Sequence, residues 1–154
     1  MFDSLMRFLK LPEPPGRPDP RLSVAVLLLE AARQDDNFDA SERKVIEALL
    51  TRRFQLTPGE CSHLMSAGEA RMSYMVELFG HTNTVTGHMT PQDRLGLVEM
   101  LWEVAYADGI LDPEEDALVR RIAGLVYVSD ADRVGARQRV LRRMQQKPGG
   151  ADSG

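Results

Sequence analysis

A duplicated acidic segment constrains the fold of this chain more than any other feature of its sequence. Residues 30–42 (EAARQDDNFDASE) align without a gap with residues 103–115 (EVAYADGILDPEE), at a constant offset of 73 positions. Both copies share the pattern E-x-A-x-x-D-x-x-[F/L]-D-x-x-E. The same offset pairs residues further along the chain: Arg21-Leu22 with Arg94-Leu95, and Phe54 with Tyr127. The repeat predicts two copies of one helix-loop-helix unit, at about 21–56 and 94–129, packed with pseudo-two-fold symmetry.

Helix-start signals occur throughout the chain and indicate an all-α fold. Five times a capping residue is followed three positions later by Glu or Asp, which places acceptors beside the free amides of a first helical turn. These sets are Asp39…Glu42, Thr57…Glu60, Thr90…Asp93, Asp112…Glu115 and Ser129…Asp132. We expect helices near 21–34, 40–54, 58–80, 91–107, 113–127 and 130–145, with one long loop at 81–88. No segment predicts a strand, so the fold class is a single helical bundle of about six to seven helices.

Composition changes mark the limits of the folded body. Residues 1–11 carry an apolar stripe at helical spacing and predict a short amphipathic helix that docks on the domain or on a partner. Residues 12–20 contain five prolines and predict an extended linker. The helical domain is then expected at 21–146, and residues 147–154 are expected to be a disordered tail.

Charge and cysteine content exclude several classes of protein. A net charge of −4 is opposite to the basic footprint of a nucleic-acid binder. The single cysteine, Cys61, excludes an intramolecular disulfide and a Cys-based zinc site. The longest strictly apolar run, residues 24–29, is far shorter than the ~20 residues of a membrane-spanning helix. We therefore expect a cytoplasmic protein with no transmembrane segment.

The two repeated loops gather carboxylates, the ligands that Ca²⁺ and Mg²⁺ prefer. The candidate metal ligands are Glu30, Asp35, Asp39 and Glu42 in the first copy, and Glu103, Asp108, Asp112 and Glu115 in the second. Residues 108–115 resemble the latter part of an EF-hand loop, but Val104 and Tyr106 stand where its first two ligands would be. A cation would therefore need a glutamate of the incoming helix, or would bridge the two loops.

Helix capping is the competing explanation of these acids. It accounts for Asp39, Glu42, Asp112 and Glu115 but not for Asp35 and Asp108, which end the incoming helices where the dipole disfavours an acid. The sequence leaves three readings of the loops open: a divalent-cation site, caps alone, or a surface for a basic partner.

Other candidate chemistry is weaker. His81 and His88 flank the predicted loop and could share a soft metal, although solvated loop histidines are the simpler interpretation. Cys61 predicts a packed thiol, and the methionines at 65, 72 and 75 predict core packing. The arginines at 133, 137, 139, 142 and 143 predict a solvated basic face. No nucleophile, cofactor cradle or catalytic constellation emerges, which favours a protein that is not an enzyme.

The two loops resemble the TerB-like family, which includes TerB tellurite-resistance proteins and the N-terminal domain of the DjlA membrane co-chaperone. Residues 30–42 and 103–115 carry the resemblance, and the Ala-Asp-Gly at 107–109 is the closer match because Asp36 replaces the glycine in the first copy. The resemblance covers roughly residues 21–145 and implies a helical bundle with paired acidic loops and a metal-linked role.

The resemblance also implies a role in tellurite resistance or stress response as a bacterial sensor or scaffold, often beside membrane partners. We expect a divalent cation of the Ca²⁺ or Mg²⁺ class and protein partners, some membrane-associated, with a place in the cytoplasm that extends to the inner membrane surface. The alternative is a metal-independent adaptor, similar to a co-chaperone, whose acidic loops bind a basic partner.

Overall fold

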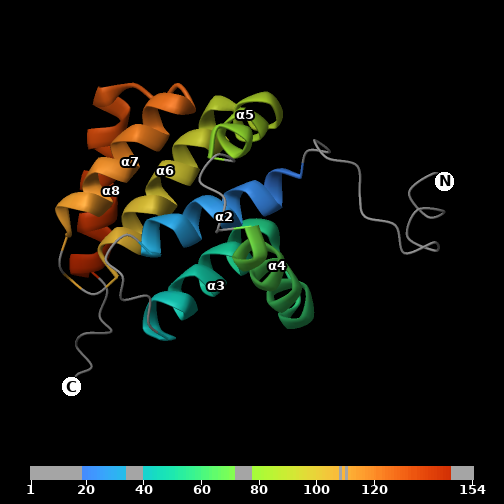
Figure 1. The fold of residues 1–154 in the computed structure, drawn as a ribbon. Helices are drawn as coiled ribbons and strands as arrows, with labels where there is room; N and C mark the ends of the chain where they lie inside the picture. The colour runs from blue at the N-terminus through green and yellow to red at the C-terminus, as the bar shows by residue number, and fades with distance from the viewer. Residues whose placement is uncertain (1–18, 34–39, 72–77, 108, 110, 147–154) are drawn as a thin grey trace, which may run out of the picture.

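The computed structural model describes residues 19–33, 40–71, 78–107, 109 and 111–146, and these residues form a bundle of seven α-helices without strands (Figure 1). The helices are α2 (Pro20–Arg33), α3 (Ala40–Phe54), α4 (Pro58–Arg71), α5 (Leu78–His88), α6 (Pro91–Ala105), α7 (Pro113–Leu125) and α8 (Asp130–Gln146). The predicted all-α fold is confirmed. The predicted helix at 1–11, most of the linker at 12–20 and the tail at 147–154 lie outside the described residues. No helix among the described residues is long and apolar enough to cross a membrane.

Helix α2 lies in the middle of the bundle (Figure 1). Every residue from Ser23 to Ala32 is buried, and α2 contacts α3, α4, α5, α6 and α7. A helix that is apolar on all sides needs such an environment, because a surface helix would leave half of these side chains in water. The apolar run at 24–29 is therefore the centre of the core.

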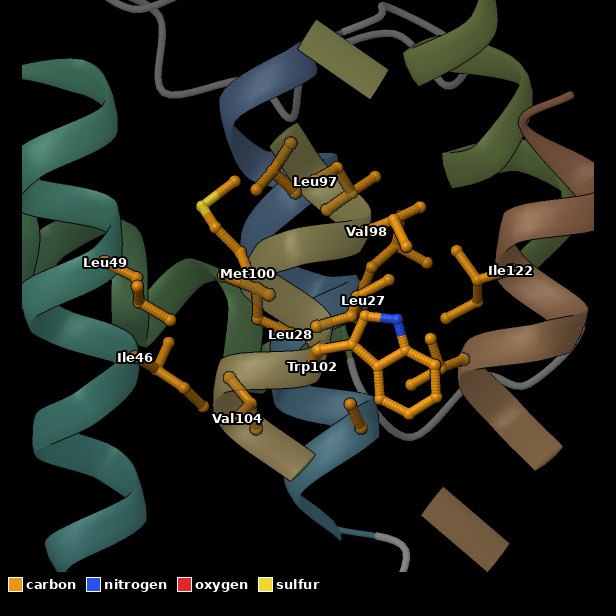
Figure 2. Packing of buried hydrophobic residues seen from close by; sticks show 14 of the residues in the cluster. Leu27, Leu28, Ile46, Leu49, Leu97, Val98, Met100, Trp102, Val104 and Ile122 are labelled. Atoms are coloured by element: carbon orange, nitrogen blue, oxygen red, sulfur yellow. The ribbon is translucent and has the colours of Figure 1, made fainter. Parts of the chain in front are cut away.

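The second central helix, α6, packs beside α2 and fills the space between α3 and α7 (Figure 2). Leu97, Leu101 and Trp102 are almost completely buried, as their helical spacing predicts. The Trp102 indole Nε1 donates a hydrogen bond to the Arg133 carbonyl at 3.3 Å. This bond satisfies the polar end of a buried aromatic side chain and ties α6 to the first turn of α8.

The predicted duplication extends over three helices in each half. Helix α2 packs on α3 and α4, and α6 packs on α7 and α8, which are the corresponding pairs in the second half. The cross contacts also correspond, because α3 touches α6 as α7 touches α2. A pseudo-two-fold relation between α2–α3–α4 and α6–α7–α8 accounts for all of these pairs, with α5 as the inserted helix.

The offset between the two halves changes where α3 and α7 end. Both helices close with the same motif, in which Leu56 N–H bonds to the Thr51 carbonyl and Val128 N–H bonds to the Ala123 carbonyl. The left-handed residue before each donor is Gln55 (φ 54°) or Tyr127 (φ 61°), so the offset here is 72. The stretch from the first helical residue to the left-handed residue is therefore one residue longer for α3 than for α7.

The predicted equivalence of Phe54 and Tyr127 is therefore wrong. Phe54 is the last residue of α3 and packs against the core, whereas Tyr127 is 78% exposed. An ungapped alignment missed the change because a single extra residue in a helix leaves both capping motifs intact.

The structure also corrects the expected helix at 58–80 and the expected loop at 81–88. Helix α4 ends at Arg71 and α5 covers 78–88. Thr82 and Val85 are buried, and the hydroxyls of Thr84 and Thr86 bond to carbonyls four residues earlier, as in a helix. The Thr- and Gly-rich sequence has weak helix propensity, and packing of α5 on α2 and α7 outweighs it.

The predicted capping pattern is confirmed at three described helix starts and in part at a fourth. Thr57 with Glu60, Thr90 with Asp93, and Asp112 with Glu115 each make both bonds of a capping box. At the start of α8 the Ser129 hydroxyl accepts from the Asp132 N–H at 3.1 Å. The first start was missed: Asp19 accepts from the N–H groups of Arg21 and Leu22, so α2 begins at Pro20 inside the predicted linker.

Replacing Tyr127 with glycine should stabilise the protein. Left-handed backbone costs a side chain of this kind about 1–2 kcal/mol, and the entropy of a new glycine returns part of the gain, so we expect a net ~0.5–1 kcal/mol. Urea unfolding measures the change, and Gln55→Gly should behave alike. Gly109 is the control, because its φ of +84° already requires glycine and Gly109→Ala should destabilise. Equal stability of Tyr127→Gly and wild type would contradict the assigned strain.

Candidate functional site

Five of the eight predicted metal ligands lie among the described residues. These are Glu30 near the end of α2, Glu42 in the first turn of α3, Glu103 near the end of α6, and Asp112 and Glu115 at the start of α7. The other three, Asp35, Asp39 and Asp108, lie outside the described residues. The part of the chain that the structure describes contains no group of three His, Cys, Asp or Glu side chains arranged to hold a metal ion. The cation site therefore stays a prediction.

Glu42 and Glu115 occupy equivalent third positions of α3 and α7 and are buried, at 3% and 2% exposure. The same position of α4 and α6 holds Glu60 and Asp93, which are much more exposed. The Thr57 amide lowers the pKa of Glu60, and the Arg53 guanidinium lowers the pKa of Asp93. A capping box can thus form when its acidic side chain is exposed to solvent. Capping alone does not explain why the acids beside the two loops are inside the domain.

Glu30 is a buried carboxylate on the most buried helix. It is 7% exposed, and Arg33 lies one turn away with its Nη2 atom 2.8 Å from the Glu30 Oε1 atom. Burial raises the pKa of Glu30, and the nearby Arg33 offsets only part of this effect. The charge of Glu30 is therefore unfavourable where the first loop begins, at the end of a helix whose dipole is also negative there.

Glu103, the repeat partner of Glu30, has a different environment. Its Oε1 atom accepts a hydrogen bond from Arg143 Nη2 at 2.7 Å, and Arg52 Nη2 lies 3.6 Å from its Oε2 atom. Two arginines from α3 and α8 thus already neutralise this carboxylate. A cation at the second loop would have to displace them, so Glu103 fits a metal less well than Glu30 does.

Three arginines of α8 form hydrogen bonds with side chains of α6 or of Tyr106, which follows it. Arg139 and Arg143 both bind Glu99, Arg143 also binds Glu103, and the Arg137 Nε atom donates to the Tyr106 hydroxyl at 2.7 Å. The expected basic face is solvent-exposed at Arg137 and Arg143, and these side chains in addition pair with Tyr106 and with residues of α6. A signal was available: Glu99 and Glu103 on α6, and Arg139 and Arg143 on α8, have the same spacing of four and opposite charges.

The expected solvated His81 is also corrected, since it is 8% exposed and its Nδ1 atom lies 2.9 Å from the Ser23 hydroxyl. His88 remains exposed at the other end of α5, two helical turns away, so the two histidines do not form a shared site. Cys61 and Met65 are buried in the core, as predicted for a packed thiol and a core methionine. The other two methionines of the stripe, at 72 and 75, lie outside the described residues.

Comparison with known proteins supplies the family. Searches of curated proteins and of solved structures gave no match to the chain. The family model described as "Tellurite resistance protein TerB" matches residues 21–138. That match spans both repeats and all of the described helices, except for Pro20 and the last turns of α8. With its seven-helix bundle and its duplicated acidic helix-loop-helix, the chain belongs to the TerB family.

Proposed function

We propose that this protein is a non-enzymatic module of the tellurite-resistance or stress-response type that binds a divalent cation of the Ca²⁺ or Mg²⁺ class and scaffolds protein partners. The burial of Glu42 and Glu115 beside the two acidic loops is the observation that carries the cation part. The same capping position is more exposed in α4 and α6, so burial at the loops serves something other than capping.

The energetics of buried charge support a cation. An ionised carboxylate taken out of water is strongly destabilised unless opposite charge approaches it. Glu42 and Glu115 both take part in interactions within the domain, and each loop adds further acids at 35 and 39 or 108 and 112. A hard cation with carboxylate ligands would neutralise these acids, and Glu30 would gain from the same charge because burial already raises its pKa.

A groove between α3 and α4 supports a role in binding proteins. It has a volume of about 560 Å³, and its lining combines the apolar Ala48, Leu56, Pro58 and Cys61 with the polar Lys44, Glu47, Thr51, Arg52 and Ser62. Hydrophobic grooves flanked by charged residues are typical of protein-binding surfaces. The alternative function is an adaptor that binds a basic partner through its acidic loops without metal. We place either activity in the cytoplasm or at the inner membrane surface, a location that the free Cys61 thiol supports.

Removal and return of divalent cations tests the proposal. After treatment with chelator, thermal unfolding and amide NMR spectra are recorded with and without Ca²⁺, Mg²⁺, Mn²⁺ or Zn²⁺. A cation at a hundred times its dissociation constant should stabilise the protein by ~2.7 kcal/mol and shift amides at 35–42 and 108–115. Asp35→Asn with Asp108→Asn removes the acids that capping does not use and should abolish the response.

The matched control is Glu114→Gln with Asp132→Asn, which removes two exposed acids outside the proposed ligand set. It should keep the response to the cation. Absence of any shift at millimolar cation would refute the cation site and favour the adaptor. Equal loss in both double variants would show that general negative charge, and no defined site, attracts the ion.

The pH dependence of stability should change in Glu30→Gln. Because burial raises the pKa of Glu30, the folded state holds this proton more tightly than the unfolded state. The contribution of protonated Glu30 to stability is complete below the ordinary pKa of 4.5. It is lost as the pH rises through the raised pKa that Glu30 has in the folded state. In chelator-treated protein, Glu30→Gln should therefore be more stable than wild type at pH 7, and the difference should shrink toward pH 4.5.

Urea unfolding at several pH values measures this difference. A difference that stays constant with pH would show that Glu30 ionises alike in the folded and unfolded states. If Glu30 is also a cation ligand, adding the cation at pH 7 should stabilise wild type more than Glu30→Gln.

A further inference from the structure

A charged cleft lies between α3, α6 and α8, and it shares Arg52 with the groove between α3 and α4. It is a cleft of about 560 Å³, a volume in the ordinary range for small-ligand sites. Its floor is one face of α6, where Gly96, Glu99 and Glu103 follow one another at helical spacing. Arg52 and Arg53 of α3 line one side, and Arg143 of α8 lines the other.

The charged side chains of the cleft leave an excess of positive charge. Three arginines and two glutamates line it, which gives one net positive charge in a protein whose overall net charge is −4. Arg139 and Asp93, which pair with lining residues, add one charge of each sign and leave the balance unchanged. The cleft is thus a local basic site on an acidic protein, which favours an anionic ligand.

The two glutamates on the floor are already bound. Glu99 accepts from Arg139 at 2.9 Å and from Arg143 at 3.0 Å, and Glu103 accepts from Arg143 at 2.7 Å. Both glutamates are thus paired with arginines of α8, so a guanidinium already opposes each carboxylate charge in the cleft.

The arginines of α3 retain most of their hydrogen-bonding capacity. A guanidinium has five N–H donors, and the side chain of Arg52 is 73% exposed with one contact to Glu103 at 3.6 Å, which is too long for a hydrogen bond. Arg53 donates a hydrogen bond to Asp93 through its Nη2 atom, and its other guanidinium N–H groups make no hydrogen bond to another described residue. The two side chains contact opposite ends of α6, because Asp93 and Glu103 are ten residues, or about 15 Å, apart along that helix. Arg53 would therefore have to leave Asp93 to approach a ligand together with Arg52.

We propose that this cleft binds a small anionic ligand through a phosphate group, with Arg52 and Arg53 as the donors and Arg143 at the opposite wall. A phosphate carries more charge and more acceptor oxygens than a carboxylate, so it can engage two guanidinium forks together. The absence of a side chain at Gly96 leaves room on the floor beneath the anion. The cleft shares Glu103 with the candidate cation ligands of the second loop, but none of its proposed anion donors belongs to that ligand set.

Titration with pyrophosphate in metal-free buffer at constant ionic strength tests the site, with amide NMR as the readout. Wild type should show saturable shifts at Arg52, Arg53, Gly96 and Arg143. Loss of hydrogen bonds from charged donors costs roughly tenfold or more in affinity, so Arg52→Ala with Arg53→Ala should weaken binding at least to that extent. Arg52→Lys with Arg53→Lys keeps the charge but removes the guanidinium forks. Its affinity for pyrophosphate should lie between that of wild type and that of the double alanine variant.

The control is Arg121→Ala with Arg142→Ala, which removes two exposed arginines outside the cleft. It should bind pyrophosphate as wild type does, and thermal unfolding verifies that every variant is folded. No saturable shift up to about 10 mM would overturn the proposal. Equal weakening in the control would also overturn it, by showing non-specific attraction. Acetate binding as tightly as pyrophosphate would overturn the assignment of a phosphate ligand.

Discussion

Helix α2 is buried on every side from Ser23 to Ala32, and the other helices are arranged around it. Such a helix cannot be stable alone in water, because its apolar surface on all sides must be covered by neighbours. The close approach of α4 shows how tight this cover is, since a Cβ atom added at Gly68 would lie 2.9 Å from the Leu29 side chain. The positions of both acidic loops follow from this packing, because α2 leads directly into the first loop and α6, its partner, leads into the second.

Duplication has produced two halves that share a framework but differ in charge. Glu30 and Glu103 are equivalent in sequence, yet Glu30 is buried beside one arginine whereas Glu103 is bound by arginines of α3 and α8. The difference arises because α8 carries an arginine pair that faces α6, and α4 presents Cys61, Met65 and Gly68 to the core on its side. The two equivalent glutamates therefore have unlike electrostatic surroundings.

The same arrangement separates the charges of the domain. The repeated acids lie in the sequence between the paired helices, and guanidinium groups of α3 and α8 lie over one face of α6. Opposite charges at a spacing of four on two packed helices neutralise one another, whereas the side chain of Arg52 on α3 stays largely exposed.

The sequence by itself determined the all-α class, most helix starts and the location of the repeat. These features depend on side chains that act on their own backbone within a few residues, such as the capping boxes at Thr57, Thr90 and Asp112. Apolar spacing likewise indicates core residues such as Leu97, Leu101 and Trp102.

Tertiary structure alone decided the helix at 78–88, the burial of His81, and the burial of Glu42 and Glu115. Each of these depends on contacts between residues far apart in the chain. Weak local propensity yields to packing in α5, and a charged side chain has the same local signal whether it faces water or another helix. The physical reason is that burial and pairing are properties of the assembled bundle, whereas capping and periodicity are properties of a single turn.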